Sequence, residues 1–170
     1  MKQADPALFD RAQRAYTQYA ALCWRVRKDK VEVLLITARD TGRWMIPRGW
    51  PMKGRSPHQA ALTEAWEEAG VRGTAGPGCI GAYAYAKGRA PETLRICMVE
   101  VYPVAVDKLS GSYPEAGQRR RKWFSPAKAA AKVADPGLAA LLARFDPRTA
   151  ALESAPVRGH LSGQTDGASR

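Results

Sequence analysis

Three glutamates within five positions are the residues of this chain whose type and spacing best suit chemistry. Glu64, Glu67 and Glu68 stand out because the chain has only 16 acidic residues. In a helix, residues three and four positions apart are neighbours, so the three carboxylates would share one face. Carboxylate oxygens suit Mg²⁺ or Mn²⁺ better than softer metals, which indicates a metal site. A solvated acidic surface is the alternative that spacing alone leaves open.

The loop before these glutamates combines glycine with positive charge. Residues 47–54 read Pro-Arg-Gly-Trp-Pro-Met-Lys-Gly. Gly49 and Gly54 allow close approach of the backbone to a ligand. Arg48 and Lys53 supply cations that suit phosphate. A basic glycine loop leading into clustered carboxylates places phosphate contacts beside a metal site, as the cleavage of a phosphoanhydride requires.

The glutamates belong to the clearest helix that the sequence predicts. Ser56 is a suitable N-cap, Pro57 suits the first helical position and Gly70 is a typical C-terminal stop. We expect the glutamates to lie opposite an apolar stripe that packs against the domain. That stripe consists of Leu62, Ala65, Trp66 and Ala69.

Strands are predicted around this helix. Residues 19–26 and 31–38 are rich in β-formers and flank a polar turn, which is typical of a hairpin. Further strand-like runs and two proline-initiated helices follow, and together they indicate a mixed α/β sandwich. The strands are predicted at 44–46, 79–86, 94–106 and 121–124, and the helices from Pro126 to about Val133 and from Pro136 to about Phe145.

Composition divides the 170 residues into one domain with two tails. Residues 1–17 are polar and predict an N-terminal arm or short helix. Residues 18–148 have the size of an ordinary domain. Residues 149–170 are rich in Ser, Gly, Ala and Pro without periodicity, which predicts a disordered tail.

Cysteine usage and hydropathy indicate a reducing compartment. The chain has three cysteines and no Cys-x-x-Cys pair, so neither a disulfide scaffold nor a zinc site is predicted. It lacks an apolar run of eighteen residues, and its start lacks the apolar segment of a secretory signal. We therefore expect a cytoplasmic protein without a membrane partner.

The net charge of +11 favours an anionic partner. The excess falls on the folded body and includes a run of four cations at residues 119–122. In a strand, Arg119 and Arg121 would share one face. With Arg48, Lys53 and Arg55 they are candidate ligands of a highly anionic phosphorylated substrate. Protection of a strand edge explains the run of cations equally well, and solubility is a simpler reason for the net charge.

Residues 49–71 resemble the signature of the Nudix hydrolase family. That signature is Gly, five residues, Glu, seven residues, then Arg-Glu-apolar-x-Glu-Glu-x-Gly-apolar, and its spacing is kept throughout. The similarity extends over residues 18–145, and residues 115–125 resemble the diphosphoinositol polyphosphate phosphohydrolase branch. The signature positions that match are Gly49, Glu64, Ala65, Glu67, Glu68, Gly70 and Val71.

Two positions depart from the signature. Arg55 stands where Glu is usual and Thr63 where Arg is usual, and in the family these two residues pair. Because both have changed together, we expect the pair to be replaced and the site retained. The alternative is that Arg55 contacts Glu64 or Glu67 and places a cation inside the metal site.

The resemblance implies a mixed β-sheet sandwiched between α-helices and hydrolysis of a phosphoanhydride. Diphosphoinositol polyphosphates and dinucleoside polyphosphates are the substrates that it favours. By position, Glu64, Glu67 and Glu68 are the expected catalytic residues, and with the carbonyl of Gly49 they are expected to hold Mg²⁺, or Mn²⁺. The general base is not assigned among the three. Glu100 and Glu115 are both candidates for a further acid.

Three other interpretations remain open from the sequence. A non-catalytic Nudix domain that binds a nucleotide would explain the altered Arg55 and Thr63. A nucleic-acid-binding module would explain the charge, although it leaves the three carboxylates without a role. A family hydrolase that acts on capped RNA would use the basic surface as well.

Overall fold

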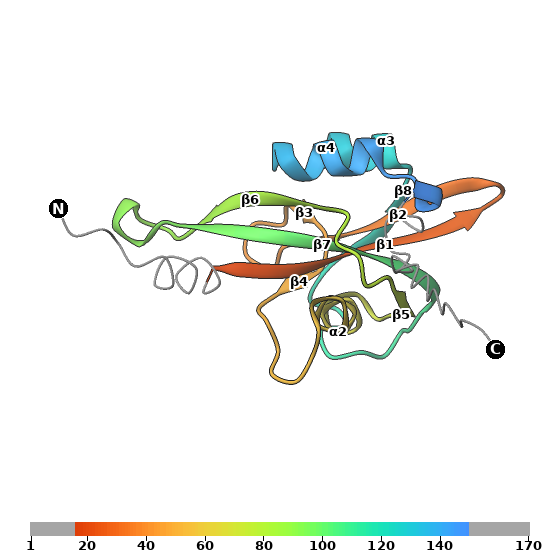
Figure 1. The fold of residues 1–170 in the computed structure, drawn as a ribbon, viewed down its shortest axis with the longest axis horizontal. Helices are drawn as coiled ribbons and strands as arrows, with labels where there is room; N and C mark the ends of the chain where they lie inside the picture. Colours follow the sequence, from red (N-terminus) through yellow and green to blue (C-terminus); the bar gives the residue numbers. More distant parts are fainter. Residues whose placement is uncertain (1–15, 150–170) are drawn as a thin grey trace, which may run out of the picture.

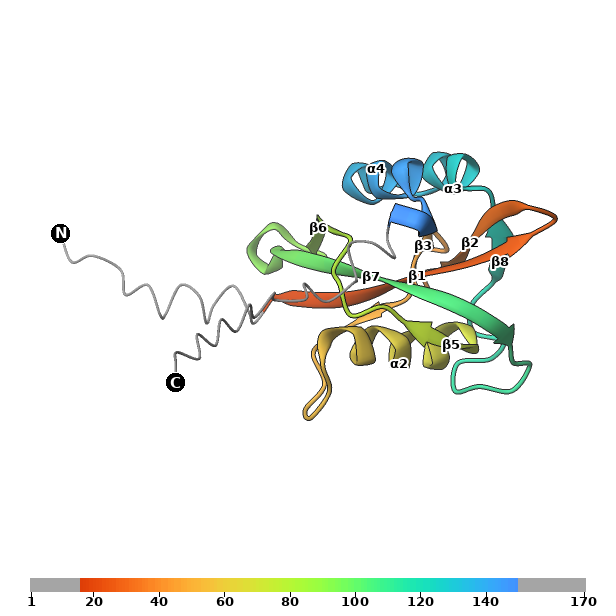
Figure 2. The ribbon, with the colours of Figure 1, turned by 45° about the vertical axis from the view of Figure 1, so that its right-hand side comes forward.

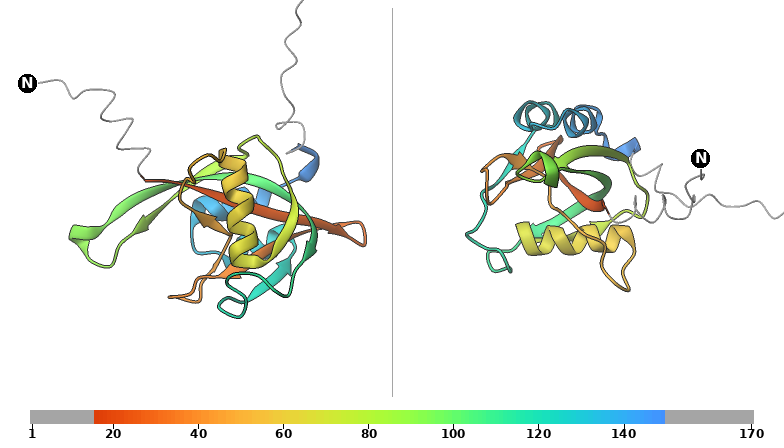
Figure 3. Two further views of the ribbon diagram at one scale, coloured as in Figure 1. Left: turned by 90° about the horizontal axis from the view of Figure 1, so that it is seen from below. Right: turned by 90° about the vertical axis from the view of Figure 1, so that its left-hand side faces the viewer.

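The structure, a computed structural model, describes residues 16–149 and is a mixed sheet covered by helices on both faces (Figure 1). The helix α2 covers one face, while α3 and α4 lie side by side on the other (Figures 2 and 3). The predicted α/β fold is therefore confirmed. The helices are α2 (Pro57–Ala69), α3 (Pro126–Lys132) and α4 (Pro136–Arg144), with a short 3₁₀ helix η1 (Pro91–Thr93).

Eight strands form one sheet, whose main order is β3-β2-β1-β7-β5. The remaining strands pair beside this path, β4 with β1, β6 with β7 and β8 with β2. The strands are β1 (Thr17–Arg27), β2 (Lys30–Thr37), β3 (Trp44–Met45), β4 (Arg48–Gly49), β5 (Val71–Ala75), β6 (Gly81–Lys87), β7 (Arg95–Leu109) and β8 (Arg121–Phe124).

The long strand β7 connects most of the sheet. It runs parallel to β1 and antiparallel to β5 and β6. The other edge of β1 pairs with β4, where Tyr19 lies opposite Gly49 and Ala20 opposite Arg48. This pairing anchors the start of the basic glycine loop at the centre of the sheet, directly before α2.

A core cluster fills the space on each face of the sheet. On the α2 face, Ala61, Ala65 and Ala69 pack against side chains that include Ile36 and Val104. On the opposite face the leucines of α4 pack with apolar side chains of the sheet; the cluster contains Leu22, Leu35, Val99, Leu138, Leu141 and Leu142. None of the helices in residues 16–149 has the length and apolar character needed to cross a membrane.

The ends of α2 follow the sequence prediction. The Ser56 backbone N–H donates to Oε1 of Gln59 at 2.9 Å, so the helix begins with a capping interaction. Gly70 adopts a left-handed φ of 67°, which favours glycine and ends the helix. Arg121 donates to the carbonyl oxygens of Ala69 at 2.7 Å and Ser110 at 2.8 Å, and thereby satisfies an acceptor at the helix terminus.

The buried face of α2 differs from the predicted stripe. Leu62 and Trp66 are only half-buried, whereas Glu68 is 7% exposed. The helix contacts the sheet mainly through alanines, which allow close approach, and Glu68 lies three residues after the buried Ala65 on that same face. The expectation that all three glutamates point away from the packed face is therefore wrong for Glu68.

Two strands had no counterpart in the prediction. β4 lies in the predicted loop, and β5 follows the helix at residues 71–75. The predicted arm at 1–17 and tail at 149–170 fall outside the described residues except for positions 16, 17 and 149, and Thr17 already begins β1.

Candidate active site

A cavity of about 860 Å³ opens beside β4 and reaches the buried end of Glu68. Six cationic residues line it, against the acidic Asp40, Glu68 and Asp135. This excess of positive charge favours an anionic ligand. The lining cations are Arg39, Arg43, Arg48, Lys87, Arg89 and Arg119.

Glu64 packs directly against the backbone of Gly49. A Cβ atom placed on Gly49 would lie 2.0 Å from Oε1 of Glu64, a distance that real side chains do not adopt. Only glycine therefore permits this approach between the loop and the helix. The predicted partners of the metal site, Gly49 and Glu64, are thus brought into contact.

Glu68 is a buried carboxylate with two nearby donors. The Arg48 backbone N–H donates to its Oε2 at 3.4 Å, and Arg119 Nη2 lies 3.5 Å from its Oε1. Burial raises the pKa of Glu68 to about 8, Arg119 opposes that shift, and repulsion from Glu64 adds to it. The two donors therefore compensate only part of the cost of burying the charged Glu68 carboxylate.

The neighbouring Glu64 is shifted in the same direction. Burial is the main cause that raises its pKa to about 7, and repulsion from Glu67 adds to it. Clustered carboxylates with raised pKa values favour a divalent cation, and their oxygens are hard ligands of the kind that Mg²⁺ prefers. By the chemistry of these donors the site fits Mg²⁺. Within residues 16–149, however, no three His, Cys, Asp or Glu side chains are preassembled into a metal cluster.

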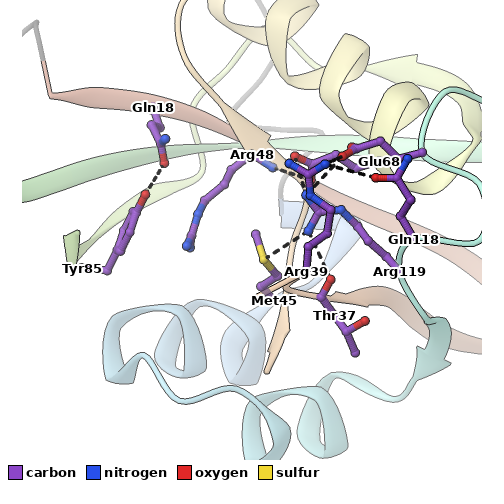
Figure 4. A network of polar contacts seen from close by, with 10 residues as sticks. Gln18, Thr37, Arg39, Met45, Arg48, Glu68, Tyr85, Gln118 and Arg119 are labelled. Carbon is purple, nitrogen blue, oxygen red and sulfur yellow. Dashed lines mark hydrogen bonds and ion pairs between the residues drawn. The ribbon is translucent and has the colours of Figure 1, made fainter. Parts of the chain in front are cut away.

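Arg119 is the cation that this acidic site contains. Its side chain is only 8% exposed, and its Nη2 lies 3.6 Å from Glu115 as well as 3.5 Å from Glu68. Its Nη1 donates to the Thr37 carbonyl oxygen at 3.1 Å, while its buried Nε has no hydrogen-bond partner. Figure 4 shows Arg119 directed at Glu68 beside Arg39 and Gln118. The sequence left open that Arg55 places a cation inside the acidic site. The structure has a cation there, and it is Arg119 and not Arg55.

Glu115 joins the carboxylates of α2 from the loop before β8. Its backbone N–H donates to the Glu67 carbonyl oxygen at 3.0 Å, and its charge contributes to the raised pKa values of Glu64 and Glu68. Glu100, the other candidate for a further acid, instead accepts a hydrogen bond from the Tyr102 hydroxyl at 3.0 Å. The geometry therefore favours Glu115.

The Arg48 side chain extends away from the carboxylates along the cavity (Figure 4). It donates to the Tyr83 hydroxyl at 3.0 Å and lies over the Tyr85 ring at 3.8 Å. Tyr85 is fixed in turn by donating to Oε1 of Gln18 at 2.7 Å. Arg48 is therefore held in place to present a charge inside the cavity.

The other predicted substrate ligands lie outside the cavity lining. Lys53 and Arg55 are exposed in the loop before α2, and Arg121 is engaged at the end of that helix. Arg55 donates a hydrogen bond to Thr63 Oγ1, so the two altered signature positions contact each other. A hydrogen bond between Arg55 and Thr63 thus stands where the family has a pair of oppositely charged residues.

Several cavity residues were not anticipated. Tyr85 and Lys87 line the cavity, and they alternate along β6 and so lie on one face of that strand. This period of two was a usable signal in the sequence. Arg39 and Arg89 lie in loops, and no local pattern marks them as residues that line this cavity.

Comparison with known proteins identifies the family of this site. Residues 16–145 match the model described as NUDIX domain. The human diphosphoinositol polyphosphate phosphohydrolase 3-beta is 30% identical over 107 residues, which cover 62% of this chain and 61% of that protein. The Arabidopsis thaliana protein named Nudix hydrolase 21, chloroplastic, is 36% identical over 101 residues, 59% of this chain and 49% of the relative. The matches thus span only part of these relatives.

Solved structures share the fold. The C. elegans Ap4A hydrolase superimposes with a TM-score of 0.59 at 21% identity, covering 79% of this chain and 98% of that one. The E. coli dihydroneopterin triphosphate pyrophosphohydrolase superimposes with a TM-score of 0.60 at 18% identity, covering 78% and 95%. At such identities the likeness concerns the arrangement of the backbone.

Proposed function

Because this chain belongs to the Nudix family, we propose that it is a divalent-metal-dependent pyrophosphohydrolase. The observation that carries the proposal is the contact of Gly49 with Glu64 beside the buried Glu68, at the end of a cavity lined by six cations. Carboxylates for a metal and cations for phosphate are thereby adjacent, as cleavage of a phosphoanhydride requires.

Glu64, Glu67, Glu68 and the carbonyl of Gly49 would hold Mg²⁺, with Mn²⁺ as a substitute. When bound, the metal neutralises charge on the phosphates and lowers the pKa of water. Among the residues of the chain itself, Arg48 and Arg119 bind and orient the phosphates.

A highly anionic substrate is the class that this cavity supports best. Six cations line the cavity against three acidic residues, and this excess of positive charge favours several phosphates in one molecule. Diphosphoinositol polyphosphates are the first class to test, because a human relative that is 30% identical is a diphosphoinositol polyphosphate phosphohydrolase. Dinucleoside polyphosphates fit the same charge requirement.

A non-catalytic binding domain is the second candidate. The observation that favours it is the pairing of Arg119 with Glu68, since the acidic site already contains a cation. In that case the cavity would bind a phosphorylated ligand without turnover.

The deciding experiment is an assay with Mg²⁺ on a panel of phosphoanhydrides, with phosphate and nucleotide release as readouts. The panel holds diphosphoinositol polyphosphates, dinucleoside polyphosphates, ADP-ribose, nucleoside triphosphates and capped RNA. We expect turnover that disappears with chelator and in Glu67→Gln, and that persists in Glu92→Gln, an exposed control on η1. Binding without turnover at every Mg²⁺ and Mn²⁺ concentration would refute the enzyme and support the binding domain.

The three cysteines fit the cytoplasm as the proposed compartment. Cys23 and Cys97 are buried and Cys79 is exposed, and all are free thiols. Free thiols persist where the environment is reducing.

A further inference from the structure

The guanidinium of Arg48 is a cation of the candidate active site that has no carboxylate partner. Arg48 is half-buried, and none of the ion pairs within residues 16–149 includes it. Asp135 lines the same cavity but forms no ion pair with it. A partly buried charge without an ion pair costs desolvation, and an anionic ligand would offset that cost. The orientation of this guanidinium therefore decides where such an anion binds.

Two tyrosines of β6 fix that orientation. Arg48 Nη1 donates to the Tyr83 hydroxyl at 3.0 Å, and Arg48 Cζ lies 3.8 Å from the centroid of the Tyr85 ring. At this distance the ring attracts the guanidinium by a cation–π interaction. One tyrosine thus holds an edge of the guanidinium and the other holds its face. Among the described residues, Tyr83 is its only hydrogen-bond partner, so its other N–H groups are available to a ligand.

The Tyr85 ring is held in turn by a buried glutamine. Its hydroxyl donates to Oε1 of Gln18 at 2.7 Å, and Gln18 is buried in β1. Both β1 and β6 pair with β7, so the glutamine and the tyrosine are fixed to one sheet. Figure 4 shows Gln18, Tyr85 and Arg48 in succession along the cavity wall. A hydrogen bond behind a ring restricts its rotamer, and the ring then restricts the group that it contacts.

The backbone and the side chain of Arg48 serve different parts of the cavity. The backbone N–H donates to Oε2 of Glu68 at 3.4 Å, whereas the side chain extends away from the carboxylates toward β6 (Figure 4). A phosphate that contacts the guanidinium therefore lies apart from Glu68, where the reacting phosphate is proposed to bind. A contact with a non-reacting phosphate is equally strong in the bound substrate and in the transition state, so it affects KM and not kcat.

We propose that Tyr85 is a positioning residue, which holds Arg48 against a non-reacting phosphate of the ligand. Tyr85 acts through Arg48, with Gln18 as its support. The inference rests on the proposed function, since the cavity must bind phosphates, but it does not require turnover. The alternative is that Tyr85 only stabilises the sheet, in which case its loss would lower stability without a specific loss of phosphate affinity.

The test is the affinity of the full chain for inorganic tripolyphosphate, measured by isothermal titration calorimetry in EDTA. Tyr85→Leu removes the ring, whereas Tyr85→Phe keeps the ring and removes only the hydrogen bond to Gln18. The matched control is Tyr113→Leu. Tyr113 is also half-buried, and Arg121 lies over its ring at 4.9 Å, but neither residue lines the cavity.

We expect Tyr85→Leu to bind tripolyphosphate about ten-fold more weakly, the scale of a partly desolvated cation–π contact. Tyr85→Phe should stay within about three-fold of the unsubstituted chain, because the ring remains beside Arg48. Its Tm should nevertheless fall, since the buried Gln18 loses its donor. Tyr113→Leu should lower the Tm as well and keep the affinity within about two-fold, as expected for a separate site.

A double-mutant cycle with Arg48→Met measures whether Tyr85 acts through the arginine. In the Arg48→Met background, Tyr85→Leu should cause no further loss of affinity, because the group that it positions is gone. With a substrate that the chain hydrolyses, Tyr85→Leu should raise KM about ten-fold and leave kcat within about two-fold.

Three results would overturn the inference alone. They are unchanged affinity in Tyr85→Leu, equal losses in Tyr85→Leu and Tyr85→Phe, and additive losses in the cycle with Arg48→Met. Unchanged affinity in Arg48→Met, or no binding by the unsubstituted chain, would overturn the phosphate-binding cavity together with the inference. Absence of turnover would refute only the proposed enzyme, since binding in EDTA is measured without catalysis.

Discussion

The Arg119 guanidinium lies 3.5 Å from the Glu68 carboxylate, and both side chains are only 8% exposed. A buried ion pair of this kind costs desolvation, and its partners depend on each other for compensation. Arg119 also neutralises the site where a divalent cation is expected. The Arg119 guanidinium and a divalent metal would repel each other at this distance, so we expect them to compete for Glu68.

Arg119→Gln should strengthen metal binding while it weakens substrate binding. Removing the competing charge is expected to raise the affinity for Mn²⁺ about ten-fold, a modest share of the Coulomb energy at this distance. The loss of a cavity cation should raise the KM for a polyanionic substrate. Titration of free Mn²⁺ by electron paramagnetic resonance measures the first effect.

Arg121→Gln is the matched control for that variant. Its guanidinium donates to the carbonyl oxygens of Ala69 and Ser110, so the substitution should lower the Tm and leave Mn²⁺ affinity unchanged. Mn²⁺ affinity in Arg119→Gln that is equal to or weaker than that of the unsubstituted chain would contradict the competition.

Metal-free protein should lose stability as pH rises. Glu64 and Glu68 have raised pKa values of about 7 and about 8, against an ordinary value of 4.5. Between pH 4.5 and these raised pKa values, the folded chain keeps protons on Glu64 and Glu68 that the unfolded chain has released. The free energy of unfolding therefore decreases with rising pH. Thermal unfolding in EDTA between pH 5 and pH 8.5 measures the effect.

Glu68→Gln provides the comparison, since a glutamine does not titrate. Its Tm should depend less on pH over the same window. Added Mg²⁺ should stabilise the unsubstituted chain more at pH 8.5 than at pH 6, because binding requires the deprotonated carboxylates. Identical pH profiles for the two proteins in EDTA would count against the raised pKa of Glu68.

We expect that the Arg55–Thr63 contact can be replaced by a pair of opposite charges with little loss of stability. Thr63→Arg alone places two guanidinium groups together and should lower stability and turnover. Arg55→Glu/Thr63→Arg restores opposite charges and is expected to return stability to within about 1 kcal/mol, the range of a surface ion pair. A double-mutant cycle by urea unfolding checks this, and additive effects of the two substitutions would show that the residues do not interact.

Gly49→Ala should impair catalysis without unfolding the chain. The new Cβ would lie 2.0 Å from Oε1 of Glu64 and must displace that carboxylate. A shift of about 1 Å in such a group costs roughly 10²-fold in rate, so we expect a loss of kcat of that order. Gly111→Ala is the control, since a Cβ there meets nothing within 4 Å. Equal activity of the two variants would remove Glu64 from the site.

Local signals in the sequence were sufficient for much of the fold. The N-cap Ser56, the stop at Gly70 and the strand at residues 121–124 are where they were predicted, because capping and β-propensity act within a few residues. The spacing of the signature likewise located the contact of Gly49 with Glu64. The two-residue strand β4 carries no pattern of its own, since only its pairing with β1 defines it.

The composition of the site required the tertiary structure. Glu115 reaches the carboxylates of α2 through a backbone hydrogen bond to Glu67, a contact across 48 positions that no local period reveals. The burial of Glu68 likewise depends on how closely the alanines of α2 approach the sheet. Charge reasoning predicted Arg119 to be a substrate ligand, and it could not reveal the pairing of Arg119 with Glu68.

The central strand β7 also limits how this molecule adapts to ligands of different length. It hydrogen-bonds to β1, which holds the start of the glycine loop through β4, and to β6, which carries Tyr83 and Tyr85. Both walls of the cavity are therefore fastened to the same strand, and they cannot separate without breaking sheet hydrogen bonds. If the proposed polyphosphorylated ligands bind in this cavity, adjustment to their different lengths must come from side-chain rotamers and from the loops that carry Arg39 and Arg89.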